Sequence, residues 1–211
     1  MSIEVLKYGG SSLTGEGRIE AVAHQVADLH RKGVSLVVVV SAVGRTTKEL
    51  IETANGFAGR LNRREVDQLI STGEQQSMAL LTMALGEMGI PARSFAGWQA
   101  GIRAGGIFTD GRVLSVDPRM VARSLEKGEV AVVAGFQGVT DGGDVITLGR
   151  GGSDLTAVAL AAALEAECCR VFTDVEGIFS ADPRVVPGAF RLEKVSYGEC
   201  MEMAAAGARI L

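Results

Sequence analysis

Runs of apolar residues alternate along the chain with segments in which apolar positions recur every three or four residues. The apolar runs occupy residues 3–6, 34–40, 113–116, 130–134 and 171–173. A run such as VSLVVVV, with almost no polar residue, is typical of a strand buried on both faces, as in a parallel sheet. Each run therefore predicts one strand of such a sheet.

The segments between these runs have the period of amphipathic helices. In residues 18–32, Ile19, Val22, Val26 and Leu29 fall on one side of a helix. Further helices are predicted at residues 48–58, 72–88, 119–127, 155–165 and 197–206. The alternation of strands and helices predicts an α/β sheet with right-handed crossovers. Residues 137–144 (QGVTDGGD) are rich in turn formers and predict a hairpin between two short strands.

Composition narrows the class of protein. The 211 residues suit one large domain or two small lobes, and 47% hydrophobic but only 5% aromatic content is typical of α/β enzymes. A net charge of −4 argues against nucleic-acid binding, which needs a basic face. The sequence contains no apolar run of about 18 residues and begins directly with a predicted strand, so neither a membrane span nor a signal peptide is expected.

The three cysteines fit neither a zinc site nor a disulfide framework. Cys168 and Cys169 are adjacent and Cys200 is distant, which matches no common ligand spacing. An odd number of cysteines suits a reducing compartment, so a cytoplasmic protein is expected. The two histidines, His24 and His30, lie on different faces of one predicted helix, and no chemistry is assigned to them.

Two glycine-rich loops follow predicted strands and precede helices. In the first, Lys7 and Tyr8 come before Gly9, Gly10 and Ser11. Glycines allow a phosphate to approach the main chain, and a lysine can neutralise its charge. The pattern is neither a Walker A motif nor a Rossmann fingerprint, so an ordinary tight turn remains the alternative.

The second loop, residues 149–154 (GRGGSD), is harder to explain as a simple turn. Arg150 has a planar guanidinium that suits bidentate capture of a carboxylate. Gly151, Gly152 and Ser153 bring free backbone N–H groups to the start of a small, apolar helix. Asp154 is equally well suited to cap that helix.

Polar residues after other strands permit two interpretations each. Ser41 ends the most hydrophobic strand, where α/β sheets bind ligands, but Thr46 or Thr47 could instead cap a helix. Ser71 and Glu74 satisfy the capping-box rule, although Glu74 could also bind an ammonium group of a substrate.

A third polar segment follows the last predicted strand. Asp174, beside Thr173, could meet a ribose or a purine edge, and Arg184 could meet a phosphate. The alternative is a solvated turn formed by Asp182 and Pro183.

These motifs, in this order, resemble the aspartate kinases (aspartokinases) of the amino-acid-kinase superfamily. The similar segments are KYGGSSL, VVVVSAVGRTTKEL, LISTGEQQSMALL, VAGFQGVTDGGDVITLGRGGSD, FTDVEGIFSADPRVV and MEMAAAGARIL. The resemblance implies a three-layer α/β/α sandwich with a mostly parallel open sheet. It also implies an amino-acid-binding lobe, mainly residues 1–135, and a nucleotide-binding lobe, mainly residues 136–211.

By the same resemblance, site residues divide into three groups. Lys7 and Asp154 would act in catalysis, with Asp154 ordering Lys7. Aspartate would be held by Thr47, Glu74, Leu125, Glu126, Arg150, Gly151, Gly152 and Ser153. ATP would be held by Lys7, Tyr8, Gly9, Gly10, Ser11, Ser41, Thr173, Asp174, Phe179, Ser180, Ala181, Asp182, Pro183, Arg184 and Arg209.

The implied reaction is phosphorylation of L-aspartate by ATP to 4-phospho-L-aspartate, the first step towards lysine, methionine and threonine. A carboxylate nucleophile with a reference pKa of about 3.9 is already ionised at pH 7 and needs no general base. Catalysis must instead neutralise charge and align the reactants. Magnesium would be carried on the ATP phosphates, without a dedicated protein site.

The sequence departs from the family pattern in three places. Phe179 stands where tyrosine is common, and Arg209 where a lysine usually meets ATP. The chain ends at Leu211, before the remaining kinase segment and the regulatory domains of relatives, so it looks like a C-terminally shortened catalytic domain.

Two alternative functions are also compatible with the sequence. The chain could be a kinase for another amino acid or for carbamate, or a catalytically incomplete member that only binds nucleotide and amino acid. The expected partners are L-aspartate and ATP, with no nucleic acid and no membrane, and a homo-oligomer is compatible with the sequence.

Overall fold

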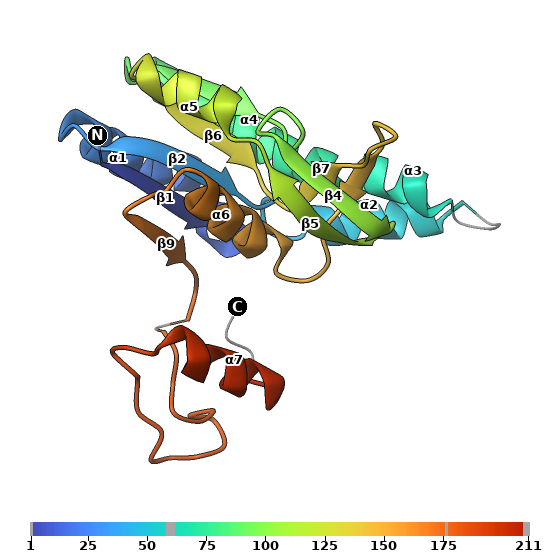
Figure 1. Ribbon diagram of the computed structural model, residues 1–211, viewed down its shortest axis with the longest axis vertical. Coiled ribbons are helices and arrows are strands. Elements are labelled where there is room, and N and C mark those ends of the chain that lie inside the picture. Colours follow the sequence, from blue (N-terminus) through green and yellow to red (C-terminus); the bar gives the residue numbers. More distant parts are fainter. Residues whose placement is uncertain (1, 58–61, 176, 209–211) are drawn as a thin grey trace. The chain divides into compact units, whose positions relative to one another are not determined.

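The computed structural model describes residues 2–57, 62–175 and 177–208 of the chain (Figure 1). These residues belong to two compact units, Met1–Phe172 and Thr173–Leu211. Among the described residues, the larger unit contains two sheets, and the smaller unit contains one helix and a looped segment.

The main sheet of the larger unit has five parallel strands in the order β3-β6-β2-β1-β9. The strands are β1 (Ile3–Tyr8), β2 (Ser35–Val40), β3 (Ala92–Phe95), β6 (Val130–Ala134) and β9 (Cys168–Phe172). Every residue of β2 and β6 is buried, as the continuous apolar runs predicted.

Helices cover both faces of this sheet. Helices α1 (Arg18–Arg31) and α4 (Thr72–Glu87) share a core with one face, and α5 (Arg119–Glu126) and α6 (Gly152–Ala163) with the other. Alternate residues of a strand serve the two cores: Val38 packs with α1 and α4, and Val37 with α5 and α6. The predicted α/β sandwich with a mostly parallel sheet is confirmed.

A second sheet has the order β5-β4-β7-β8. Its strands are β4 (Ile102–Ile107), β5 (Asp110–Val116), β7 (Gln137–Val139) and β8 (Val145–Thr147). The antiparallel pair β7–β8 confirms the hairpin predicted from QGVTDGGD. Residues 113–116 were wrongly assigned to the parallel sheet. They belong to β5, which pairs antiparallel with β4 and is only partly buried.

Two further helices precede α4. Helix α2 (Thr46–Asn55) begins two residues before the prediction, whose last position, residue 58, lies outside the described residues. Helix α3 (Arg63–Ile70) was not predicted because its sequence is largely polar. Only Ser71 separates α3 from α4, so the two helices form one continuous segment.

Short elements complete the chain. A 3-10 turn, η1 (Gly10–Leu13), follows β1. In the smaller unit, Phe179 pairs with Arg191 in an isolated β-bridge, and a Ser196–Glu199 capping box begins α7 (Tyr197–Ala205). Within the described residues, no helix is both long and apolar enough to cross a membrane.

Candidate functional site

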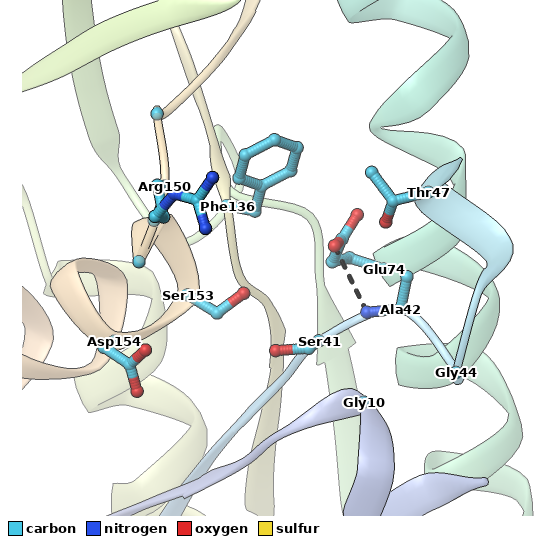
Figure 2. Close-up of a pocket in the computed structure, with 13 residues that line it drawn as sticks. Gly10, Ser41, Ala42, Gly44, Thr47, Glu74, Phe136, Arg150, Ser153 and Asp154 are labelled. Atoms are coloured by element: carbon cyan, nitrogen blue, oxygen red, sulfur yellow. Dashed lines mark hydrogen bonds between the residues drawn. The ribbon is translucent and has the colours of Figure 1, made fainter. Parts of the chain in front are cut away.

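A cavity of about 270 Å³ opens where β1, β2 and β6 end and α6 begins (Figure 2). The carboxyl ends of parallel strands are the usual ligand-binding edge of an α/β sheet. Arg150 and Ser153 lie on one side of the cavity, and Thr47 and Glu74 on the other (Figure 2). Its lining consists of Gly10, Ser41, Ala42, Gly44, Thr47, Glu74, Phe136, Gly149, Arg150, Gly151, Gly152, Ser153 and Asp154.

An ion pair stands at the β1 side of the cavity. Lys7 is near the end of β1, and its Nζ lies 2.8 Å from Oδ1 of Asp154 in the first turn of α6. Both side chains are largely buried, and buried charges in proteins are normally paired in this way. The alternative that Asp154 caps α6 is wrong, because Gly151 precedes the helix and the aspartate carboxylate binds Lys7.

Glu74 is a second buried carboxylate, on the opposite wall. Its Oε1 accepts a hydrogen bond from the Ala42 N–H at 3.2 Å (Figure 2). Its Oε2 is buried without a hydrogen-bond partner among the residues the structure describes. Burial raises the pKa of Glu74 from 4.5 to about 7, and the hydrogen bond from Ala42 lowers it by a smaller amount.

The capping alternative for Glu74 is wrong. The Ser71 hydroxyl donates to the Gln68 carbonyl at 3.0 Å, and the Glu74 carboxylate is bound to the loop after β2. Gly73 makes this approach of α4 to the loop possible, because a Cβ there would lie 2.9 Å from Ala42 Cβ.

The Arg150 loop forms the wall facing Glu74. Arg150 is exposed, whereas Ser153 is 92% buried at the start of α6. Gly151 adopts a φ of 74°, a left-handed conformation that favours glycine. Because a Cβ at Gly152 would lie 2.8 Å from Phe136 Cδ2, this glycine is required for the contact between α6 and the Phe136 ring.

The loop after β2 contributes Ser41 to the lining, and the first turn of α2 contributes Thr47. Thr46 and Thr47 lie inside α2, which follows Arg45, and the Thr46 hydroxyl donates back to the Val43 carbonyl at 2.8 Å. The alternative that either threonine caps the helix is therefore wrong, and the Thr47 side chain is available to the cavity (Figure 2).

The first glycine-rich loop is shaped mainly by contacts within the protein. A Cβ at Gly10 would lie 2.6 Å from the Ala42 carbonyl oxygen, so the glycine allows two loops to meet. The Gly9 N–H donates to the Phe172 carbonyl at 3.2 Å, and Ser11 is exposed. The Tyr8 ring is buried and stacks on Phe172 at 4.5 Å, and burial raises its pKa to about 12. The Tyr8 side chain thus belongs to the core.

Leu125 and Glu126 do not join this site. They end α5, which leads into the amino end of β6, whereas the cavity lies beyond its carboxyl end. The five residues of β6 separate the two edges by about 16 Å. Leu125 is also buried in the core beneath α5, and it is not among the residues that line this cavity.

The predicted nucleotide residues beyond β9 lie in the smaller unit. Thr173 and Asp174 are joined through their side chains at 3.2 Å. Arg184 binds Asp182 at 2.8 Å in an exposed turn, and this contact lowers the pKa of Asp182. Arg209 lies outside the described residues. Between Asp174 and Arg184 lie the other predicted positions, Phe179, Ser180, Ala181 and Pro183, and the Ser180 N–H donates to the Phe190 carbonyl at 2.9 Å.

Phe136 is a cavity residue that the sequence reasoning missed. Its φ of 67° is unusual for a residue other than glycine. Its N–H donates to Thr156 Oγ1 at 3.1 Å, and its carbonyl accepts from the Leu148 N–H at 2.8 Å. Its position just after a predicted strand was the available signal.

Residues 2–57, 62–175 and 177–208 contain no cluster of three His, Cys, Asp or Glu side chains that could hold a metal ion.

Comparison with known proteins places this site in a family. Residues 2–211 match the Amino acid kinase family, and the chain belongs to it. The aspartokinase of Geobacillus stearothermophilus is 49% identical over 211 residues, which are 100% of this chain and 52% of that protein. The chain spans about half the length of the curated relatives it matches.

Solved structures agree with this assignment. The aspartate kinase of Synechocystis has a TM-score of 0.84 and 44% identity, with 100% of this chain and 34% of that chain covered. E. coli aspartokinase III, solved with aspartate and ADP, has a TM-score of 0.80 and 26% identity, with 96% and 56% covered. The resemblance predicted from the ordered motifs is confirmed.

Proposed function

We propose that this chain phosphorylates the side-chain carboxylate of L-aspartate with ATP, giving 4-phospho-L-aspartate. The observation that carries the proposal is the cavity that sets Glu74 opposite Arg150. An α-amino acid has an ammonium group and a carboxylate on one carbon, and these two side chains offer one complementary charge to each. The similarity to aspartokinases then favours aspartate among the amino acids.

Glu74 would hold the substrate ammonium group. Its Oε2 is buried and without a hydrogen-bond partner in the described part of the chain, which is costly unless a ligand supplies a donor. An ammonium group supplies both a donor and a positive charge, and this charge would stabilise the ionised form of Glu74. Thr47 lies beside Glu74 and would contact the same end of the substrate (Figure 2).

Arg150 and the start of α6 would hold the α-carboxylate. A guanidinium binds a carboxylate through two parallel hydrogen bonds. The first turn of the 12-residue α6 presents backbone N–H groups and a positive dipole end, and Ser153 adds a hydroxyl. Gly151 lets the ligand approach this backbone, whereas Gly152 serves the packing of α6 against Phe136.

Lys7 would stabilise the phosphoryl group during transfer. An anionic nucleophile and an anionic phosphate repel each other, so a preorganised cation lowers the barrier. Asp154 fixes the Lys7 ammonium at 2.8 Å and so orients it. The solved complex of E. coli aspartokinase III with aspartate and ADP supports a nucleotide as the second substrate.

Several finer predictions accompany this proposal. Magnesium would bind the ATP phosphates and help to neutralise their charge. Thr173, Asp174 and residues 179–184 would line the adenine and phosphate site, Gly9 and Gly10 would hold the phosphates, and Ser41 would lie on the nucleotide side. The lobe division at residue 135, a cytoplasmic location and a homo-oligomer also remain predictions.

A coupled assay of ADP release with L-aspartate and Mg-ATP tests the proposal. We expect turnover that depends on aspartate, with a KM for aspartate about 100-fold higher in Glu74→Gln and unchanged in Glu52→Gln, an exposed glutamate on α2. A panel of glutamate, N-acetylated amino acids and carbamate would reveal a different acceptor. Calorimetry that detects aspartate and ATP binding without turnover would replace the proposal by a binding function.

A further inference from the structure

Two buried polar side chains attach the β7–β8 hairpin to the α3–α4 segment. Asp67 of α3 and Gln137 of β7 are both fully buried. Gln137 pairs with Thr147 across the hairpin, so both attachments lie at one register position. We call Asp67, Gln137 and Thr147 the buried clamp.

Asp67 receives three hydrogen bonds from two other elements. Its Oδ2 accepts from the Thr109 N–H at 2.9 Å and from the Thr147 N–H at 3.0 Å. Its Oδ1 accepts from Thr147 Oγ1 at 2.6 Å. One carboxylate therefore joins α3 to the end of β8 and to the turn between β4 and β5.

Gln137 makes the second attachment. Its Nε2 donates to the Ser71 carbonyl at 2.9 Å, and its Oε1 accepts from Gln75 Nε2 at 3.3 Å. Ser71 is the single residue between α3 and α4. The hairpin is thus bound to the helical segment on either side of this junction.

The residues of the buried clamp lie close in sequence to one residue on each wall of the cavity. Thr147 lies three residues before Arg150, and Asp67 lies seven residues before Glu74 in the continuous α3–α4 segment. The turn at Thr109 supports the loop as well, because a Cβ at Gly149 would lie 2.5 Å from Asp110 Oδ1. The clamp therefore links the loop that carries Arg150 to the helix that carries Glu74.

We propose that Asp67 is a positioning residue that sets the spacing between Arg150 and Glu74, and with it the affinity for an α-amino acid. The inference rests on the proposed function, but Asp67 itself is not among the residues that line the cavity. A purely structural role would make Asp67 important for stability alone. Positioning predicts in addition a larger effect on the amino-acid substrate than on ATP, because the hydrogen bonds of Asp67 reach the segment that carries Arg150, whereas the loops after β1 and β2 would hold the ATP phosphates.

The test compares variants of the 211-residue chain by the KM for aspartate, the KM for ATP and kcat. In Asp67→Ala three hydrogen bonds are lost, and we expect the KM for aspartate to rise about tenfold or more, with the KM for ATP changed less than about twofold. Asp67→Asn should restore a KM near the original, because its amide oxygen can accept both N–H groups and its NH₂ can donate to Thr147 Oγ1. Asp28→Ala, on the exposed face of α1, is the matched control.

Thr147 provides a milder test if Asp67→Ala does not fold. Thr147→Val keeps the shape but loses one hydrogen bond, so a rise of about threefold to tenfold in the KM for aspartate is expected. Thr147→Ser keeps the hydroxyl and should stay within about twofold, by the same reasoning.

Hydrogen exchange supplies a readout that does not depend on turnover. Backbone amides of residues 148–152 should exchange faster in Asp67→Ala and Thr147→Val, with β2 unchanged. Unaltered exchange in that loop, or an unaltered KM for aspartate together with a lower Tm, would overturn the positioning role. If the unsubstituted chain shows no aspartate phosphorylation, the proposed function fails, and the exchange data still decide whether Asp67 positions the loop.

Discussion

The two sides of the cavity each contain a buried carboxylate, and the two carboxylates differ in their partners. On the β1 side, Asp154 lies 2.8 Å from the Lys7 ammonium. On the α4 side, Glu74 accepts a hydrogen bond from the Ala42 N–H at 3.2 Å, and burial raises its pKa to about 7. Both residues occupy the first turn of a helix, so the helix end does not explain the difference. The difference is that the protein places a lysine beside Asp154, whereas Oε2 of Glu74 has no hydrogen-bond partner among the described residues.

This contrast separates two kinds of functional group. The charge of Asp154 is satisfied by Lys7, so we propose that Asp154 holds Lys7 in place. Glu74 keeps one buried oxygen without a partner in the described part of the chain, so it is suited to a cation that arrives with a ligand. The predictions that follow test this contrast.

Replacing Lys7 by methionine should have the largest effect. It removes the preorganised cation, so turnover should fall about 10³-fold. It also leaves Asp154 as a buried carboxylate without its partner, which should lower the free energy of unfolding by about 3 kcal/mol. Urea denaturation and the ADP-release assay measure the two effects.

The double variant Lys7→Met/Asp154→Asn separates stability from chemistry. We expect most of the lost free energy of unfolding to return, because the unpaired charge is gone, while turnover stays low. Recovery of turnover in the double variant would contradict the role assigned to Lys7.

Glu74→Gln should reverse the sign of the stability effect. The amide retains an acceptor for the Ala42 N–H but has no charge for a substrate ammonium group, so the KM for aspartate should rise about 100-fold. At pH 8 the free energy of unfolding should be equal or higher, since no carboxylate is buried. A clear loss of stability at pH 8 would show that Glu74 has a cationic partner within the protein.

The pH dependence follows from the raised pKa of Glu74. Because the folded state binds this proton more tightly than the unfolded state, the free energy of unfolding should fall between pH 4.5 and about 7, by about 3 kcal/mol in all. Glu74→Gln should lack this component. Aspartate binding needs the ionised form, so its KM should decrease about tenfold from pH 6 to pH 8, a change that a pH series with and without the substitution would detect.

The fold was predictable where hydrophobic patterning is strong. The continuous run that forms β2 predicts a strand buried on both faces, and the structure agrees. Helix α3 escaped prediction because polar residues dominate it, and tertiary contacts such as those of Asp67 hold it in place. Residues 113–116 show the same limit, since a short apolar run does not reveal which sheet it joins.

The residues of the candidate site were only partly predictable from sequence motifs. Arg150 and Glu74 follow recognisable loops, and the structure places both at one cavity. Capping rules gave alternatives for Glu74 and Asp154 that are wrong, because both side chains bind elements distant in sequence. Phe136 lies within a quoted motif but was not singled out, and its unusual φ accompanies a hydrogen bond to Thr156 of α6, which is distant in sequence.

The smallest effect is expected for an ion pair at the surface. Asp117 binds Arg119 just before α5, and its pKa is lowered to about 2 by hydrogen bonds from that arginine. Both side chains are well exposed, so solvent screens the attraction. Asp117→Asn keeps an acceptor for the Arg119 N–H and should shift the Tm at pH 7 by no more than about 1 °C, with turnover unchanged. A decrease in Tm as large as that of Lys7→Met would contradict this expectation. It would mean that burial does not distinguish the exposed Asp117–Arg119 pair from the buried Lys7–Asp154 pair.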